Sequence, residues 1–100
     1  MISRDDISAA HERIAAHIRR TPVLELEADA LGVGHALTLK LEHLQKTGSF
    51  KLRGAFNNML ATDLPEAGVV ATSGGNHGAG VAHAATKLGA KSVIFVPAHI

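Results

Sequence analysis

A lysine just inside the predicted start of a helix is the residue best placed to act as a nucleophile. The turn residues Thr47 and Gly48 precede Ser49, a common helix-capping type, and helix-compatible apolar residues follow from Phe50 onward. Lys51 then lies in the first turn, where the partial positive charge of the helix N-terminus disfavours a second cation. Two interpretations follow. Lys51 extends to solvent like an ordinary surface lysine, or its neutral amine serves carbonyl chemistry such as a Schiff base.

A glycine-rich loop between a predicted strand and a predicted helix is the second segment that could do chemistry. Residues 73–78 read Ser-Gly-Gly-Asn-His-Gly. Adjacent glycines let the backbone approach a ligand closely, and the unpaired N–H groups of a first helical turn attract anions. The order of residues matches neither a Walker loop nor the Gly-x-Gly-x-x-Gly pattern of dinucleotide sites. Taken alone, these residues fit an anion site and a tight turn without a ligand equally well.

Residues 40–55 and 68–78 resemble, in order, two motifs of the threonine/serine dehydratase family. These are pyridoxal-phosphate enzymes of fold type II, a group that includes serine racemase. The first segment is similar to the family's cofactor-lysine segment and the second to its Ser-x-Gly-Asn-His loop. The resemblance covers nearly all of the chain and implies pyridoxal 5′-phosphate as cofactor. It implies that Lys51 forms the Schiff base and then removes the α-proton, its neutral form favoured by the helix terminus and by burial.

The resemblance implies further roles around Lys51. Phe50 would pack against the cofactor ring, although taken alone it also fits a core residue. The Asn76 amide would contact the 3′ oxygen of the ring. Backbone donors that would hold the substrate carboxylate belong to Ser73, Gly74, Gly75, Asn76 and His77. The His77 imidazole can titrate near neutrality, but the resemblance implies a structural hydrogen bond rather than proton transfer.

These roles imply β-elimination from a hydroxy amino acid such as L-threonine or L-serine, giving a 2-oxo acid and ammonia. Gly74 stands where eukaryotic serine racemases carry an acid–base serine, so racemisation ranks below elimination. Ala79, where relatives commonly have glutamine, leaves hydroxyaspartate and related β-hydroxy amino acids open as substrates. The alternatives from other classes are a non-catalytic truncated fragment and a nucleotide-binding module.

Composition and charge limit the classes of partner. The 100 residues are 46% apolar and carry a net charge of +1 without a basic run, so a small amino-acid substrate is expected rather than nucleic acid. No apolar run is long enough to span a membrane, and no cysteine is present, which favours a cytoplasmic protein. A homo-oligomer is expected for the full-length form. The pairs His11 and His17, and His77 and His83, are each spaced too far apart on a helix to share a metal. Arg53 and Glu42 could clamp an anion or be paired on the surface, and neither is placed in the catalytic set.

Helical and extended patterns alternate along the chain, which predicts an α/β fold with a parallel sheet and flanking helices. The expected helices cover residues 5–20, with Ser3 as a cap, 50–61, and 77 or 78 to 88. The expected strands cover residues 37–41, 69–72 and 91–96, with a shorter extended piece at 23–26 and a helical turn at 27–31.

The resemblance also predicts the domain organisation, in which residues 1–100 form a single incomplete unit, the N-terminal part of a tryptophan synthase beta-like fold. Residues 1–45 would hold the N-terminal helix and first strand, which belong to the larger domain in the family. Residues 46–100 would begin the smaller α/β domain that carries the cofactor lysine. The family's phosphate-binding glycine loop and the residue facing the pyridine nitrogen would lie beyond Ile100.

Overall fold

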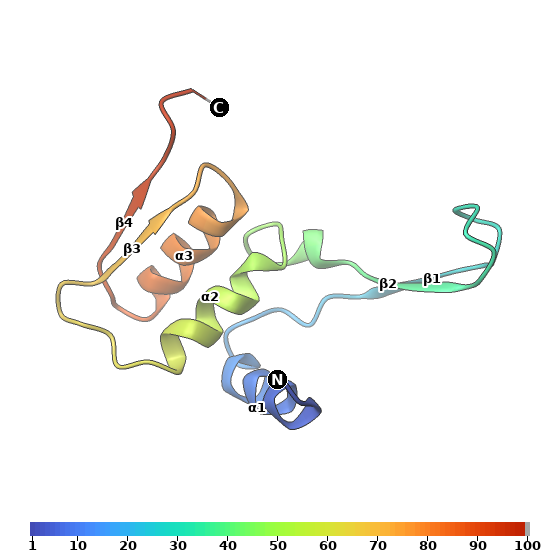
Figure 1. Ribbon diagram of the computed structural model, residues 1–100, viewed down its shortest axis with the longest axis horizontal. Helices are drawn as coiled ribbons and strands as arrows, with labels where there is room; N and C mark the ends of the chain where they lie inside the picture. Colours follow the sequence, from blue (N-terminus) through green and yellow to red (C-terminus); the bar gives the residue numbers. More distant parts are fainter. Residues whose placement is uncertain (100) are drawn as a thin grey trace.

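A computed structural model of the chain describes residues 1–99. Its helices are α1 (Arg4–Ile14), the short 3-10 helix η1 (Glu42–Leu44), α2 (Lys51–Leu60) and α3 (Asn76–Lys87). Its strands are β1 (Val23–Leu26), β2 (Leu37–Lys40), β3 (Val69–Thr72) and β4 (Ser92–Phe95). The three longer helices lie together with β3 and β4, while β1 and β2 extend away from them as a narrow arm (Figure 1).

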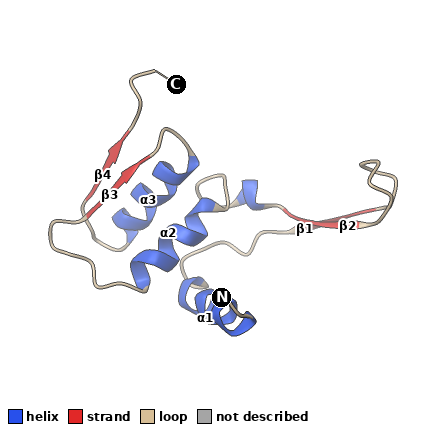
Figure 2. Cartoon of the chain, viewed as in Figure 1, coloured by secondary structure: helices blue, strands red, loops and turns tan. Residues whose placement is uncertain are grey.

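The C-terminal half forms the predicted strand–helix–strand unit. Strands β3 and β4 pair in parallel, with Val69 opposite Ser92 and Thr72 opposite Phe95. Partly buried and exposed residues alternate along both strands, because successive side chains of a strand point to opposite faces. The predicted α/β fold, a parallel sheet with flanking helices, is confirmed, and β3 has the predicted bounds (Figure 2).

The strand near residue 37 does not join that parallel sheet, contrary to the simple alternation of strands and helices. Strands β1 and β2 pair antiparallel as a separate two-stranded sheet, with Leu24 opposite Leu39. Residues 27–36 connect them, and a parallel crossover needs roughly a dozen or more residues. Gly32 and Gly34 turn this connection with φ of 67° and 79°, a left-handed conformation that glycine adopts without strain.

Helix α1 begins as predicted but ends about six residues earlier than the expected end near residue 20. Ser3 caps it, and a capping box joins Ser3 to Asp6. Beyond Ile14 the buried side chain of Gln45 binds the backbone of Arg19, accepting from its N–H at 2.8 Å and donating to its carbonyl at 2.8 Å. These contacts replace the helical hydrogen bonds, so the predicted extension of the helix is wrong.

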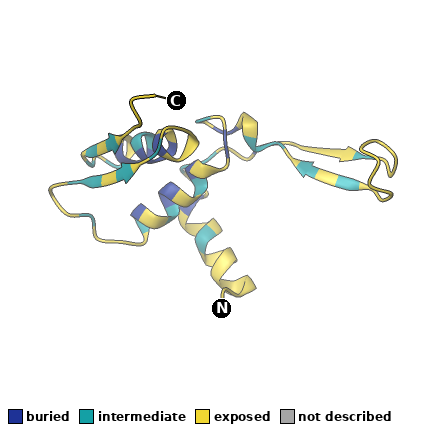
Figure 3. Ribbon diagram, turned by 45° about the horizontal axis from the view of Figure 1, so that its top comes forward, coloured by how far each residue is buried: buried dark blue, intermediate teal, exposed yellow. Residues whose placement is uncertain are grey.

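The core lies between α2 and α3. Leu52, Ala55, Phe56 and Met59 form a buried stripe on α2 with the i, i+3, i+4, i+7 spacing of an amphipathic helix. Phe56 and Leu52 are 1% and 0% exposed, and Ala84 of α3 is also fully buried. Buried residues gather on these two helices, whereas the β1–β2 arm is mostly exposed (Figure 3).

Two kinds of feature are absent from residues 1–99. No helix there is long and apolar enough to cross a lipid bilayer. In the same part of the chain, no group of three or more His, Cys, Asp or Glu residues lies close enough to hold a metal ion.

Candidate functional site

Lys51 is the first residue of α2, as predicted, but the capping differs by one residue. Phe50 is the cap residue with φ −68° and ψ −14°, already close to helical. The Ser49 hydroxyl accepts a hydrogen bond from the backbone N–H of Lys51 at 3.3 Å. Phe50 is 60% exposed, so its interpretation as a core residue is wrong. Its ring centroid lies 5.4 Å from Lys51 Nζ, within cation–π range.

The Lys51 amine is not committed to a protein partner. Among residues 1–99, no carboxylate lies within 4.0 Å of Nζ, and no hydrogen bond to Nζ is formed. Lys51 is exposed rather than buried, which corrects the expectation that burial would favour its neutral form. An exposed and unpaired amine is accessible to a carbonyl compound, as nucleophilic chemistry requires.

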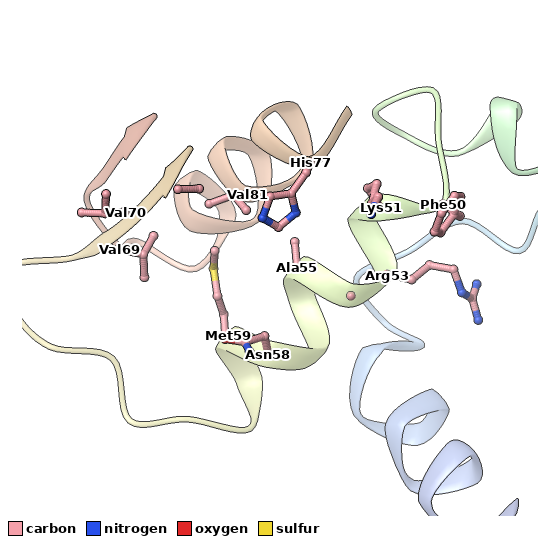
Figure 4. A pocket seen from close by; sticks show the side chains of 12 residues that line it. Phe50, Lys51, Arg53, Ala55, Asn58, Met59, Val69, Val70, His77 and Val81 are labelled. Atoms are coloured by element: carbon pink, nitrogen blue, oxygen red, sulfur yellow. The ribbon is translucent and has the colours of Figure 1, made fainter. Parts of the chain in front are cut away.

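A cavity of about 620 Å³ lies beside Lys51, between α2, β3 and α3. Phe50, Lys51 and His77 are the predicted site residues that line it. His77 extends from α3 toward Ala55, on the same side of α2 as Lys51 (Figure 4). The volume falls in the range of roughly 300–1,000 Å³ that is typical of small-molecule sites.

The apolar walls of this cavity were not identified from the sequence as part of the site. Ala55 and Met59 line it from α2, and Val81 lines it from α3. Lys51, Ala55 and Met59 follow one another at intervals of four residues, which places them along one face of the helix. That spacing was the feature of the sequence from which these lining residues could have been predicted.

Fewer backbone N–H groups are free to bind an anion in the loop before α3 than the sequence predicts. The Ser73 N–H donates to the Phe95 carbonyl at 2.9 Å, and the Gly75 N–H donates to the Ser73 hydroxyl at 3.2 Å. Within the described chain the backbone N–H groups of Gly74, Asn76 and His77 have no protein partner, as expected for the start of a helix. A carboxylate-binding role for the loop stays a prediction, with these three N–H groups available.

The other predicted loop residues lie outside the lining of the 620 Å³ cavity; they are Ser73, Gly74, Gly75 and Asn76. The structure therefore places Phe50, Lys51 and His77 together and leaves the other loop residues at the start of α3, outside the cavity lining. The predicted contact of Asn76 with the cofactor ring stays a prediction.

Two glycines fix how α3 lies against its neighbours. A Cβ on Gly78 would meet the Ser73 carbonyl oxygen at 2.9 Å and the Ile94 Cγ2 atom at 3.0 Å. A Cβ on Gly80 would lie 3.3 Å from the backbone of Lys51 and Leu52. Helix α3 thus packs directly against the first turn of α2, which sets the separation between Lys51 and the loop.

Arg53 and Glu42 form a partly buried ion pair, and Arg53 also lines the cavity beside Lys51. Arg53 Nη1 lies 3.4 Å from Glu42 Oε1, and the Thr21 hydroxyl donates to Glu42 Oε2 at 2.5 Å. The Arg53 side chain extends away from His77 (Figure 4). The two residues are therefore paired, as one of the two interpretations expected, but the pair is partly buried rather than on the surface.

The residues beside Lys51 fit pyridoxal phosphate, the cofactor that the sequence resemblance implies. An uncommitted amine suits attachment of an aldehyde, and the exposed Phe50 ring beside it can pack against a flat heterocycle. The unpaired N–H groups at the start of α3 suit an anionic group.

Comparison with known proteins supports the same cofactor. Residues 14–100 match the family model described as pyridoxal-phosphate dependent enzyme. Serine racemase of Dictyostelium discoideum is 42% identical over 96% of this chain and 30% of its own length. L-threo-3-hydroxyaspartate ammonia-lyase of a Pseudomonas species is 42% identical over 95% of this chain and 30% of its own length. The crystal structure of a threonine deaminase from T.th. has a TM-score of 0.82 and 49% identity, covering 97% of this chain and 34% of that one.

The chain thus spans about 30% of the length of the curated relatives it matches. The family match covers most of the chain and names the predicted cofactor, so that prediction is confirmed. The chain belongs to the family of pyridoxal-phosphate-dependent enzymes.

Proposed function

We propose that the protein is a pyridoxal-phosphate-dependent dehydratase, an ammonia-lyase that performs β-elimination on a hydroxy amino acid such as L-threonine or L-serine. The observation that carries this proposal is the unpaired Lys51 amine at the start of α2, beside the cavity that His77 also lines. Membership of the family and similarity to a threonine deaminase support it.

Each residue of the site has a separate role in the proposed reaction. When bound, pyridoxal phosphate draws electron density away from the substrate Cα. Lys51 would hold the cofactor through Nζ, and its neutral amine would take the proton from Cα. Phe50 would pack against the cofactor ring, and the Asn76 amide would contact the 3′ oxygen. Loss of the β-hydroxyl and hydrolysis then give a 2-oxo acid and ammonia.

Substrate orientation falls to the loop before α3. The free N–H groups of Gly74, Asn76 and His77 hold the substrate carboxylate, where the positive end of the helix favours an anion. Fixing the carboxylate fixes the direction of the bond to the α-proton, which is the main contribution of a positioning loop. His77 contributes its backbone N–H and a structural hydrogen bond rather than a proton.

Racemisation is the second candidate, because a serine racemase is among the relatives. Proton return to the opposite face of Cα needs an acid on that face. Gly74 has no side chain that could supply one. Elimination needs no second acid at that position, so elimination ranks first, with hydroxyaspartate as an alternative substrate in view of the Pseudomonas relative.

A non-catalytic role for the 100-residue chain is the third candidate. The observation behind it is that the chain spans about 30% of the length of its curated relatives. The division into a portion of the larger domain at 1–45 and the start of the smaller domain at 46–100 is part of this proposal. A homo-oligomer and a cytoplasmic location remain predictions for the full-length form.

A product assay separates these candidates. The purified chain is incubated with pyridoxal phosphate and L-threonine, L-serine or L-threo-3-hydroxyaspartate. Release of 2-oxo acid is followed as its hydrazone, and D-amino acid is followed by chiral chromatography. We expect 2-oxo acid without D-amino acid, lost in Lys51→Ala and kept in Lys91→Ala, which removes an exposed lysine elsewhere.

The other outcomes are equally informative. D-amino acid as the main product would contradict elimination and favour the racemase. Absence of both products would contradict catalysis by this chain and favour the fragment. Equal activity in Lys51→Ala would contradict the assignment of the catalytic lysine.

A further inference from the structure

A second cavity, of about 460 Å³, lies beside α1. It is formed by α1, by the segment after α1, and by single residues of β2 and α2. Its apolar lining residues are Ala15 and Ile18. Every charged side chain that lines it is basic; these are Arg19, Arg20, Lys40 and Arg53, with His11 beside them.

The nearby carboxylate does not neutralise all of the basic residues that line this cavity. Glu42 is the carboxylate that pairs with Arg53, at 3.4 Å, and its second oxygen is occupied by Thr21. Among residues 1–99, Arg19, Arg20 and Lys40 have no carboxylate within 4.0 Å. Like charges gathered around one cavity repel one another, and a bound anion relieves that repulsion.

Two of the basic residues are held in place by the fold. The side chain of Gln45, which is 3% exposed, binds both the N–H and the carbonyl of Arg19 at 2.8 Å. The Arg19 guanidinium in turn donates to the Leu44 carbonyl at 2.8 Å. Lys40 lies at the end of β2 with its Nζ 3.4 Å from the Thr21 carbonyl. These contacts restrict two of the cations that line the cavity, which lowers the entropic cost of binding an anion there.

We propose that this cavity binds a small phosphate-bearing molecule, separately from the cofactor and substrate. Guanidinium groups match the oxygens of a phosphate in pairs, and three unbalanced cations suit a dianion. The apolar lining residues Ala15 and Ile18 can contact a short organic portion of such a molecule. Arg53 lines this cavity as well as the cavity beside Lys51, so the anion binds on the same turn of α2 as the catalytic lysine.

The test uses the 100-residue chain labelled with 15N, without pyridoxal phosphate. Inorganic phosphate and glycerol 3-phosphate are titrated separately at constant pH and ionic strength, and amide shifts are recorded. We expect saturable shifts at residues 18–20. Arg20→Gln and Lys40→Gln should each raise the half-saturating concentration about tenfold, the usual cost of one charge-assisted hydrogen bond. Arg4→Gln, which removes an exposed arginine outside the cavity, should leave it unchanged.

Each outcome decides the proposal. Tighter binding of glycerol 3-phosphate identifies an organic phosphate as the ligand, and equal binding identifies the free ion; both support the site. Equal weakening in Arg4→Gln and Arg20→Gln would overturn it, since it would indicate a general charge effect. Shifts confined to residues 74–77, or no saturable shift in the folded wild-type chain, would overturn it as well. Circular dichroism tests whether each variant is folded. If Arg20→Gln does not fold, the half-saturating concentration of Lys40→Gln decides the test.

Discussion

His83 is the residue whose ionisation is most strongly tied to the core. Its ring lies edge-on to Phe56 with centroids 6.2 Å apart, while His17 stacks on Phe56 at 5.0 Å. Within the described residues its Nε2 atom is buried without a hydrogen-bond partner. Burial lowers the pKa of His83 below its usual 6.5, and the positive charges of Lys87 and Lys46 lower it further.

This lowered pKa predicts a stability that falls with acidity. The unfolded chain binds a proton at His83 near pH 6.5, but the folded chain resists protonation until a lower pH. The contribution of neutral His83 to stability is therefore complete above the unfolded-state pKa of 6.5 and is lost as the pH falls from there toward the lower folded-state pKa. Melting temperatures measured between about pH 7.5 and pH 5.5 should fall more for the wild type than for His83→Gln.

The exposed His99, which lines neither cavity, provides the control for this prediction. His99→Gln should retain the wild-type dependence of the melting temperature on pH. If the melting temperatures of the wild type and of His83→Gln depended on pH in the same way, His83 would not be the group responsible.

At the scale of elements, the position of α3 depends on close contact at Gly78. Alanine there would place a methyl group 2.9 Å from the Ser73 carbonyl oxygen, a distance that real Cβ atoms do not reach. Gly78→Ala should lower the free energy of unfolding by about 1–3 kcal/mol because the loop or β4 must shift. Urea denaturation measures this change.

Gly54 is the matched control for that substitution. A Cβ there meets no atom within 4 Å, and the residue is an exposed position inside α2. Gly54→Ala should raise the free energy of unfolding by up to about 1 kcal/mol, since alanine favours a helix. A loss of stability in Gly54→Ala, or none in Gly78→Ala, would contradict the packing described for α3.

The elements differ in how far local sequence specifies them. Strand β3 matches its predicted bounds because a short apolar run ends abruptly at glycines, and α2 and α3 begin and end within about two residues of expectation. The end of α1 could not be predicted, because Gln45, 26 residues further along the chain, takes the hydrogen bonds of Arg19. The antiparallel pairing of β1 with β2 likewise depends on a partner strand rather than on the pattern within one strand.

The candidate site was likewise predictable from local sequence only in part. The type and place of Lys51 at a helix start follow from local turn and helix patterns. Its exposure and the lining of the cavity depend on how α3 packs on α2, which the contact at Gly80 determines. The commitment of the Ser73 N–H to β4 is also a long-range contact, so no local pattern indicates which loop donors stay free.

At the scale of the whole molecule, Glu42 joins three segments that are distant in sequence. It accepts a hydrogen bond from Thr21, which is 4% exposed and precedes β1, and it pairs with Arg53 of α2. Glu42→Ala would leave the buried Thr21 hydroxyl without a partner. We expect a loss of about 1–3 kcal/mol in the free energy of unfolding.

Glu25→Ala is the control, since Glu25 is exposed on β1. Thermal unfolding of both variants compares a linking carboxylate with an ordinary surface one. Similar melting temperatures for the two variants would mean that Glu42 does not hold the β1–β2 arm against the helices.

The assignment of Lys51 as the residue that carries the cofactor is tested most directly by visible absorption spectroscopy. Spectra of the chain with added pyridoxal phosphate are recorded before and after borohydride reduction. We expect a band that borohydride removes, reduced cofactor on the peptide that contains Lys51, and no such band in Lys51→Ala, while Lys91→Ala keeps it. A band that survives in Lys51→Ala, or no band in the wild-type chain, would contradict the assignment of Lys51.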